Sequence, residues 1–179
     1  MRQSHFDVVD EHDEPTGQSA TFDEVHSQGL WHRGVHVIIY TPDKRILMQK
    51  RAVSLAFHPG EIEVSVGGGV DAGESAEQAA IREVLEETGI KLKKRELHFI
   101  GKVKYNYRTR RGASRVIQYS YSACLPMERI HLTANPEETQ ELFFISKRRL
   151  RLSLATHSIA RFGRISSRYA YWRYLLDAI

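Results

Sequence analysis

Short runs of β-branched and aromatic residues, separated by turn-forming residues, recur along most of the chain. The run Gly34–Tyr40 is followed by the turn residues Pro42–Lys44 and by the apolar segment Ile46–Met48, which predicts a hairpin. Further strands are predicted at Glu61–Val66, Leu97–Tyr107, Arg115–Leu125 and Glu141–Ile145. Near the start, Phe6–Val9 and the turn Pro15–Gly17 predict a small hairpin within an N-terminal extension of residues 1–30.

Two segments have helical periodicity instead. Ser75 is a favourable N-cap, Gln78 completes a capping box, and Gly89 is a stop signal. Between them the expected buried stripe consists of Ala80, Ile81, Val84, Leu85 and Thr88. A second helix is predicted over Ile159–Leu176, with one face formed by Phe162, Ile165, Tyr169, Trp172 and Leu176.

Composition favours a single domain spanning residues 1–179. The chain has 179 residues, 41% of them hydrophobic, and it contains no internal repeat. Its single cysteine, Cys124, excludes a disulfide framework and is expected to be inert core. Because no apolar run approaches the roughly 20 residues of a membrane helix and the N-terminus is rich in acids, we expect a cytoplasmic protein without a targeting segment.

Positive charge is concentrated at the C-terminus. The basic helical segment 147–179 carries a net charge of +7, which leaves −3 for the rest of a chain whose total is +4. Arg161, Arg164 and Arg168 repeat at helical spacing, so they either bind nucleic acid or form a solvated face that pairs with acids such as Asp7 and Asp13. We favour pairing within the chain or between subunits of a homodimer over RNA binding.

Candidate chemistry is concentrated between residues 66 and 90. Four glycines fall within residues 67–73, and a flexible backbone of this kind allows a phosphate or a metal ion to approach closely. Glu83, Glu86 and Glu87 follow on the predicted helix at spacings of three and four, where they repel one another unless a cation lies among them. Magnesium, or else manganese, is the expected cation. For either half alone, the favoured explanation is a tight turn before a helix in which Arg82 pairs with Glu86.

Together the two halves resemble the Nudix box. Gly68 is followed after five residues by Glu74, and after seven more by the run Arg82–Ile90, so that nine fixed positions over residues 68–90 agree. The resemblance implies an α/β/α sandwich around a mixed β-sheet, with a short N-terminal hairpin extension and a C-terminal helix. It also implies divalent-metal hydrolysis of a diphosphate linked to another group, X.

The same resemblance implies roles for individual residues. Glu83 and Glu87 would be the principal magnesium ligands, Glu86 a third, and the Gly67 carbonyl a further one. Arg82 and Glu74 would organise the loop and the helix. The general base is left open between a glutamate of the box and a later acid, for which Glu137, Glu138 and Glu141 are candidates; of the three we select Glu138.

Residues outside the box resemble one branch of the family, which includes type I isopentenyl-diphosphate isomerase. The similarity is carried by Gly29–Arg33, Gln49–Arg51 and His58–Gly60. Gly67 and Gly69 stand where the isomerases have a catalytic cysteine and a metal-binding histidine, so isomerisation is not expected. The diphosphate would be bound by Lys50 and Arg51, for which a solvated strand end is the alternative, and by Arg33 and Gly68.

Two further features remain open. His32 falls at a metal-ligand position of the isomerases, but without the partner residues we expect a structural role. Segment 102–115 mixes Tyr105 and Tyr107 with cations, which indicates a hairpin with a charged tip or, second, a nucleobase pocket. The leading functional prediction is a magnesium-dependent hydrolase of a small nucleotide or nucleoside diphosphate derivative. The alternative is a Nudix-fold module that binds RNA or a protein.

Overall fold

The computed structural model describes residues 4–55, 58–109, 112–159, 162–165 and 169–179. Its strands are β1 (His5–Val9), β2 (Pro15–Thr21), β3 (Trp31–Tyr40), β4 (Arg45–Arg51), β5 (Ile62–Glu63), β6 (Val66–Gly69), β7 (His98–Thr109), β8 (Gly112–Cys124), β9 (Thr139–Ser146), β10 (Ser158–Ile159) and β11 (Gly163–Arg164). Its α-helices are α1 (Phe22–Ser27), α2 (Ala76–Thr88), α3 (Lys147–Thr156) and α4 (Tyr169–Asp177). Two 3₁₀ turns span Lys94–Glu96 and Met127–Arg129.

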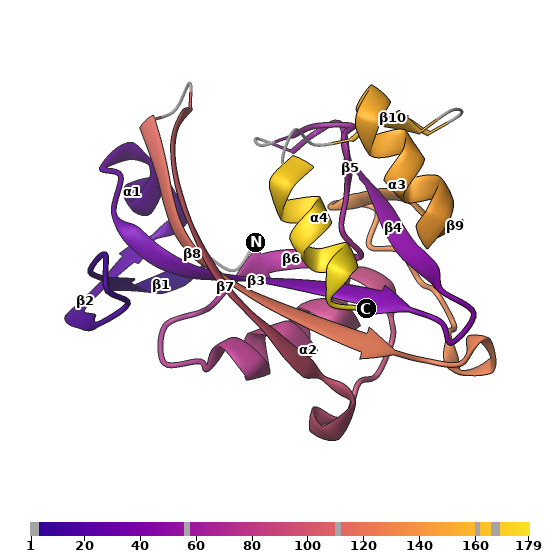
Figure 1. The fold of residues 1–179 in the computed structure, drawn as a ribbon. Coiled ribbons are helices and arrows are strands. Elements are labelled where there is room, and N and C mark those ends of the chain that lie inside the picture. The colour runs from indigo at the N-terminus through magenta and orange to yellow at the C-terminus, as the bar shows by residue number, and fades with distance from the viewer. Residues whose placement is uncertain (1–3, 56–57, 110–111, 160–161, 166–168) are drawn as a thin grey trace.

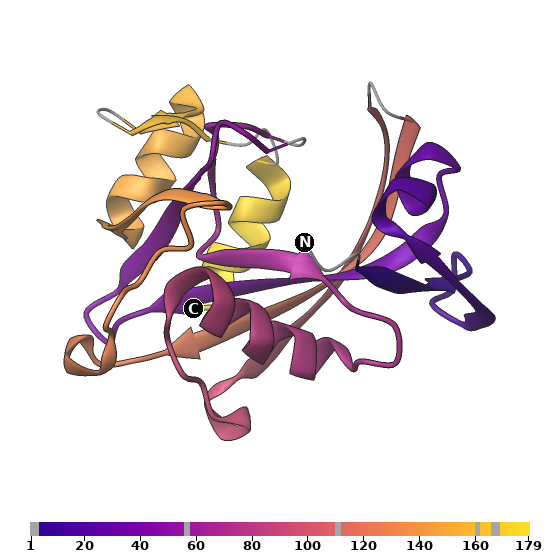
Figure 2. The same ribbon diagram turned by 180° about the vertical axis from the view of Figure 1, so that it is seen from behind.

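Strand β3 is the centre of a mixed sheet in the described chain. It pairs in parallel with β8 over its whole length and antiparallel with β1, β4 and β6. Strands β7 and β9 extend the sheet by antiparallel pairing with β8 and β4. Helix α2 covers one face, and α3 and α4 cover the other, as Figures 1 and 2 show from opposite sides. The predicted α/β/α sandwich is therefore confirmed.

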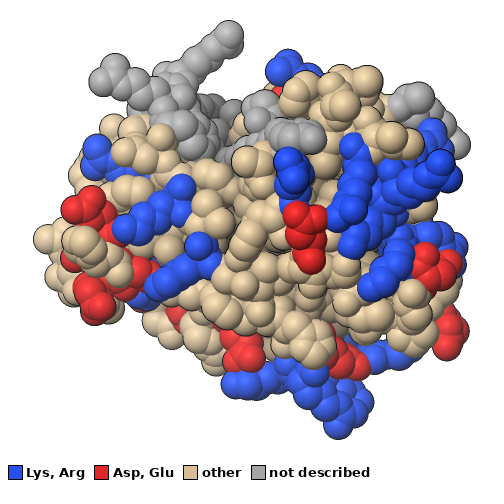
Figure 3. Space-filling view, in the orientation of Figure 1, with Lys and Arg blue, Asp and Glu red and all other residues tan. Residues whose placement is uncertain are grey.

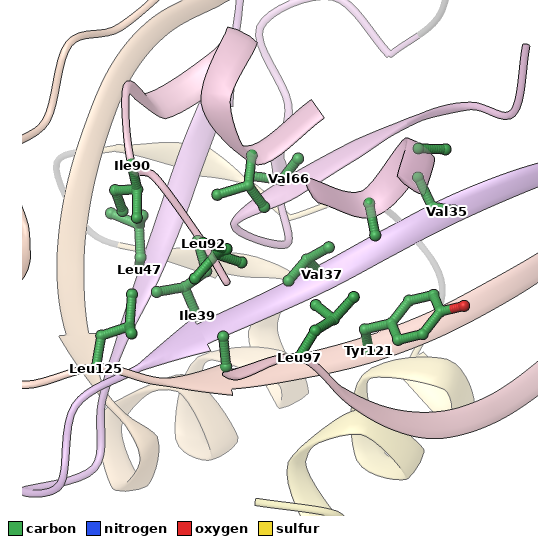
Figure 4. Close-up of a cluster of buried hydrophobic side chains, with 14 of the residues drawn as sticks. Val35, Val37, Ile39, Leu47, Val66, Ile90, Leu92, Leu97, Tyr121 and Leu125 are labelled. Carbon is green, nitrogen blue, oxygen red and sulfur yellow. The ribbon is translucent and has the colours of Figure 1, made fainter. Parts of the chain in front are cut away.

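Each face of the sheet has its own hydrophobic core. On the α2 side, alternate residues Val35, Val37 and Ile39 of β3 pack against the helix (Figure 4). On the opposite side, Ile38 packs with Trp172 of α4 and with α3. This alternation is the period-2 pattern of a strand buried on both faces. It determines which residues of β3 lie beneath α2 and which lie beneath α4.

The predicted strands are present, with one division. The segment Glu61–Val66 contains the short strand β5 and the first residue of β6, because Val64 and Ser65 lie between the two strands. The hydroxyl of Ser65 donates to the Leu47 carbonyl at 2.6 Å and accepts from the Ile39 amide at 2.8 Å. A side chain thus takes the place of a ladder hydrogen bond at this point.

Several predictions at the two ends are wrong in detail. Pro15 begins a strand, and the hairpin turn lies at residues 10–14. Helix Ile159–Leu176 does not exist as one element, because Gly163, with a φ of 116°, lies in β11, and the helix begins only at Tyr169. Leu85 is exposed because it lies on the outer face of α2, and Cys124 is exposed because β8 ends there.

Candidate active site

Helix α2 begins and ends where its capping residues predict. The Ser75 hydroxyl accepts from the Gln78 amide at 3.2 Å, the Gln78 side chain accepts from the Ser75 amide, and Gly89 adopts a left-handed conformation. These caps define the two ends of the helix. Buried Ala80 and Val84 turn one side of the helix toward the sheet, and Glu83 and Glu87, one turn apart, also lie inward and are only 8% and 3% exposed.

Three consecutive glycines of β6 form a thin wall beside these carboxylates. A β-carbon on Gly67 would lie 2.6 Å from the His36 ring, one on Gly68 would overlap the Glu83 carboxylate, and one on Gly69 would overlap the Phe6 ring. Each glycine therefore makes room for a different side chain. Because residues alternate along a strand, Gly68 faces α2, while Gly67 and Gly69 face the opposite side.

The carboxylates of Glu83, Glu87 and Glu138 form one cluster, in which Glu83 and Glu87 are buried and Glu138 is half-buried. Each offers an oxygen, and the three oxygens lie within 4.8 Å of one another. Burial raises the pKa of Glu83 to about 7, and burial with repulsion from Glu83 and Glu138 holds the pKa of Glu87 well above its usual value. Burial also raises the pKa of Glu138. Carboxylate oxygens that lie this close together are the ligands that a divalent cation such as Mg²⁺ prefers.

Arg82 connects the helix to the loop before it. Its guanidinium donates to Glu74 at 2.9 Å, to Glu83 at 2.7 Å and to the Gly69 carbonyl at 3.0 Å. It also donates to Glu86 at 3.1 Å, whose side chain is 54% exposed. Arg82 and Glu74 thus connect the glycine-containing segment to α2, which fits the role expected for them in holding the loop and the helix together. Glu138, the residue directly before β9, belongs to the cluster with Glu83 and Glu87, whereas Glu86 does not.

Two buried side chains that the sequence analysis did not select hold Glu87 in place. Gln49 of β4 donates through Nε2 to Glu87 Oε2 at 3.1 Å, and Thr139 of β9 donates to Gln49 Oε1 at 2.8 Å. Because β4 and β9 are paired, this chain is anchored in the sheet. A polar residue at an inward position of an otherwise apolar strand is the signal that could have identified Gln49 (Arg-Ile-Leu-Met-Gln at 45–49).

A cavity of about 610 Å³ opens in front of the cluster. Gly67, Gly68 and Gly69 line its floor, Arg82, Glu83 and Glu138 line one side, and Phe6 and Phe22 the other. Its volume lies within the range of roughly 300–1,000 Å³ that is usual for small-molecule sites. The described residues therefore contain a cleft in which a diphosphate could meet the carboxylates.

The predicted diphosphate-binding residues Lys50 and Arg51 differ in position. Arg51 forms an ion pair with Glu63 at 3.1 Å, and its charge lowers the pKa of both Glu87 and Glu138. It is therefore close to the acidic cluster. Lys50 is half-buried and is not among the described lining residues of the cavities near the cluster.

Arg33 is bound to the N-terminal hairpin. Its Nε donates to Asp13 Oδ1 at 2.7 Å, and Asp13 also accepts from Lys102 at 2.6 Å and from the Tyr119 hydroxyl. Arg33 still lines a cavity beside the cluster, but its guanidinium is committed to Asp13. Among the described residues, the side chain of Asp13 thus pairs with Arg33, Lys102 and Tyr119.

The two histidines of β3 have structural partners. His32 Nδ1 faces the Leu30 carbonyl at 3.2 Å, and burial lowers the pKa of His32 to about 4. His36 Nδ1 lies 2.7 Å from the Tyr171 hydroxyl of α4. The structural role expected for His32 is consistent with this burial.

The basic C-terminal residues lie away from the cleft. Basic side chains gather over α3, on the right of Figure 3, where Arg151 pairs with Asp177. Arg161 and Arg168 of the predicted arginine stripe, and the side chains of the predicted charged tip at 107–111, lie outside the described residues. No helix in the described ranges is long and apolar enough to cross a membrane.

Comparison with known proteins identifies the family. Residues 30–163 match the model of the NUDIX domain, and the chain belongs to this family. It is 39% identical over 95 residues to Nudix hydrolase 3 of Arabidopsis thaliana, a match covering 52% of this chain and 12% of that protein. It is 37% identical over 84 residues to an uncharacterized Nudix hydrolase of Yersinia pestis, covering 47% and 46%. The matches thus span at most about half of these relatives.

Solved structures share the fold. A Deinococcus radiodurans protein superposes with a TM-score of 0.70 at 20% identity, covering 94% of this chain and 97% of its own. The dihydroneopterin triphosphate pyrophosphohydrolase of E. coli superposes with a TM-score of 0.59 at 24% identity, covering 82% and 96%. The NUDIX domain of Shewanella oneidensis NrtR, solved with ADP ribose, gives 0.57 at 16%, covering 81% and 86%.

Proposed function

We propose that the protein is a magnesium-dependent hydrolase that splits a diphosphate linkage in a nucleoside diphosphate derivative. The observation that carries the proposal is the cluster of Glu83, Glu87 and Glu138 beside the glycine wall. Keeping the carboxylates of Glu83 and Glu87 buried beside a half-buried Glu138 costs stability, which a divalent cation and a phosphate substrate would offset. Two proteins of the same fold have names that refer to a pterin triphosphate and to ADP ribose.

In this proposal Glu83 and Glu87 hold the ion, with Glu86 and the Gly67 carbonyl as further ligands. Bound Mg²⁺ or Mn²⁺ supplies positive charge that offsets the phosphate oxygens and acidifies a water molecule. Arg82 keeps Glu83 oriented, and the Thr139–Gln49 pair keeps Glu87 oriented. Arg51 contributes positive charge on the substrate side of the cluster.

The chemical step is attack of water on phosphorus. The water oxygen forms a new bond to phosphorus, the bond from phosphorus to the bridging oxygen breaks, and the second phosphate leaves with that oxygen. Glu138 accepts the proton that the water loses. Its position opposite the helix carboxylates and its raised pKa suit it to this role.

A release assay tests the proposal. The purified chain is incubated with nucleoside di- and triphosphates, nucleotide sugars, dinucleotides, coenzyme A and prenyl diphosphates, with Mg²⁺, with Mn²⁺ and with a chelator. We expect metal-dependent cleavage of at least one nucleotide compound, and loss of it in Glu83→Gln. A folded, metal-saturated protein that cleaves none of them contradicts the proposal.

A binding module is the second candidate, supported by the basic surface over α3 (Figure 3). Phosphate contacts to single-stranded RNA would make affinity fall with salt, with a slope near −0.7 per contact. Titration of a short RNA at two salt concentrations separates the two candidates. Weak, salt-insensitive binding favours the enzyme, whereas micromolar binding that falls tenfold between them favours the module.

A further inference from the structure

A second, smaller cavity lies on the side of the glycine wall that faces away from α2. Its volume is about 240 Å³, and it shares Phe6, Phe22 and the glycines of β6 with the larger cleft. The two cavities therefore adjoin each other along β6. Because its volume falls slightly below the usual range of roughly 300–1,000 Å³ for whole ligands, it suits one part of a ligand whose diphosphate lies at the carboxylates.

Gln118 lines this cavity with an unused hydrogen-bond donor. The residue lies in β8 opposite Gly34 of β3 and is only 5% exposed. Its side-chain nitrogen, Nε2, is buried and has no hydrogen-bond partner in the protein. Leaving such a group unpaired destabilises the folded chain, so a ligand acceptor at this position would recover a penalty that folding has already incurred.

Gly34 keeps the space in front of the amide open. A β-carbon at Gly34 would lie 3.1 Å from Gln118 Oε1 and 3.1 Å from the side chain of Val116, closer than side chains normally approach. Gly34, Val116 and Gln118 all line the cavity. The absence of a side chain at Gly34 therefore makes room for the Gln118 amide beside the cavity.

Aromatic rings form the wall on the other side. Phe6, Phe22, His26 and His32 line the cavity together. The centroid distances are 4.3 Å between Phe22 and His26, 5.2 Å between His26 and His32, and 5.5 Å between Phe6 and His32. Phe22 is 38% exposed, which leaves part of an aromatic face available to a ligand. Such walls favour planar rings.

We infer that this cavity binds the nucleobase of the substrate and that Gln118 recognises it through a hydrogen bond. The inference rests on the proposed hydrolysis of a nucleoside diphosphate derivative and specifies where the nucleoside end of that substrate binds. A base supplies both a planar ring for the aromatic wall and carbonyl or ring-nitrogen acceptors for the amide. A prenyl chain supplies no acceptor and would leave Gln118 unpaired.

Binding of analogues that resist hydrolysis tests the inference. Isothermal titration compares α,β-methylene nucleoside diphosphates with methylenediphosphonate, which lacks the base, in the presence of Mg²⁺. For Gln118→Leu we expect about tenfold weaker binding of the best nucleotide and unchanged binding of methylenediphosphonate. Gln18→Leu, at an exposed position of β2, is the matched control and should change neither.

Stability and a second variant guard against a trivial loss of structure. Gln118→Leu removes an unpaired buried donor, so its melting temperature should equal or exceed that of the wild type. Phe22→Ala changes the opposite wall and should weaken the same nucleotide about fivefold without affecting methylenediphosphonate. Because Phe22 is partly exposed, this variant tests the cavity even if Gln118→Leu folds poorly.

The outcomes separate the inference from the proposed function. Equal nucleotide affinity in the wild type, Gln118→Leu and Phe22→Ala overturns the inference, even if diphosphates are cleaved. If Gln118→Leu binds dimethylallyl diphosphate more tightly than the wild type binds any nucleotide, the inference is also overturned. An apolar group on the diphosphate is then favoured for this cavity. Gln118-dependent nucleotide binding without any cleavage supports the inference and contradicts the hydrolase.

Discussion

Gly68 and Glu83 occupy adjoining space, so that a β-carbon on the glycine would overlap the carboxylate of the glutamate. Strand β6 and helix α2 can therefore approach each other this closely only because residue 68 has no side chain. From the sequence, the glycines are expected to let a phosphate or a metal ion approach the backbone closely. The structure shows that protein side chains also depend on their small size.

Replacing Gly68 with alanine should therefore displace Glu83. We expect turnover to fall about hundredfold, because a shift of about 1 Å in a reacting group can cost that much, and stability to fall by about 1–3 kcal/mol from overpacking. Gly17→Ala, where nothing lies within 4 Å but φ is 78°, should lower stability without lowering turnover per folded molecule. Equal turnover in both variants would contradict this account.

Glu87→Gln should lower turnover about hundredfold or more, because a charged ligand is lost. Its thermal stability without metal should stay level or rise, since burial and repulsion from Glu83 and Glu138 disfavour the charge. Mn²⁺ titration should show weaker binding. Glu86→Gln is the comparison: its carboxylate is half-exposed and paired with Arg82, so we expect a smaller loss. An opposite order would move the principal ligand to Glu86.

Glu138→Gln should separate the base from the ligands. If Glu138 takes the proton, its loss should reduce kcat about hundredfold while Mn²⁺ affinity stays within about threefold. Single-turnover kinetics and metal titration on the same preparation measure both. A parallel loss of metal affinity would instead assign Glu138 to the ion.

Gln49→Met should weaken metal binding through Glu87. The change keeps the volume and removes the amide that donates to Glu87 Oε2 at 3.1 Å. Changes in such supporting contacts typically cost 10–100-fold in metal affinity or activity. Thr139→Val, which removes the next hydrogen bond, should shift affinity in the same direction by less. Unaltered affinity in Gln49→Met would show that Glu87 needs no support.

The contribution of His32 to stability should fall as pH is lowered from 7 to 5, whereas Glu83, whose pKa burial raises to about 7, acts in the opposite direction over the same range. Burial lowers the pKa of His32 to about 4, against about 6.5 in the unfolded chain. The unfolded state therefore binds more protons between these values, and stability is lost as pH falls through 6.5 toward 4. Its share is about 2 kcal/mol by linkage. Urea unfolding of wild type and His32→Phe at both pH values measures it. An identical pH dependence would exclude His32.

Local signals predicted the elements that depend on neighbouring residues. The caps of α2 and the β3–β4 hairpin follow from Ser75, Gln78 and the Pro42–Lys44 turn, and they occur as expected. The predicted start of the C-terminal helix is too early. Ile165 and Trp172 are both buried, but Ile165 forms a β-bridge with Ile62 and only Trp172 lies in the short helix α4. Periodicity cannot distinguish these arrangements.

Contacts between distant segments could not be predicted. Arg33 lies at a plausible substrate position in the sequence, yet Asp13, twenty residues earlier, binds its guanidinium. Gln49 and Thr139 are ninety residues apart and meet only because β4 pairs with β9. The motif itself located Glu83 and Glu87, whereas the arrangement around them depends on the sheet.

The glycine wall also constrains how this sequence can diverge. A side chain introduced at Gly67 would overlap His36, and one introduced at Gly69 would overlap Phe6. Each substitution should therefore be tolerated only if the overlapped residue is replaced by a smaller one. Neighbouring positions of one strand are thus coupled to different partners. A saturation library should reveal this as pairwise epistasis, in which compensating double variants survive although both single variants fail.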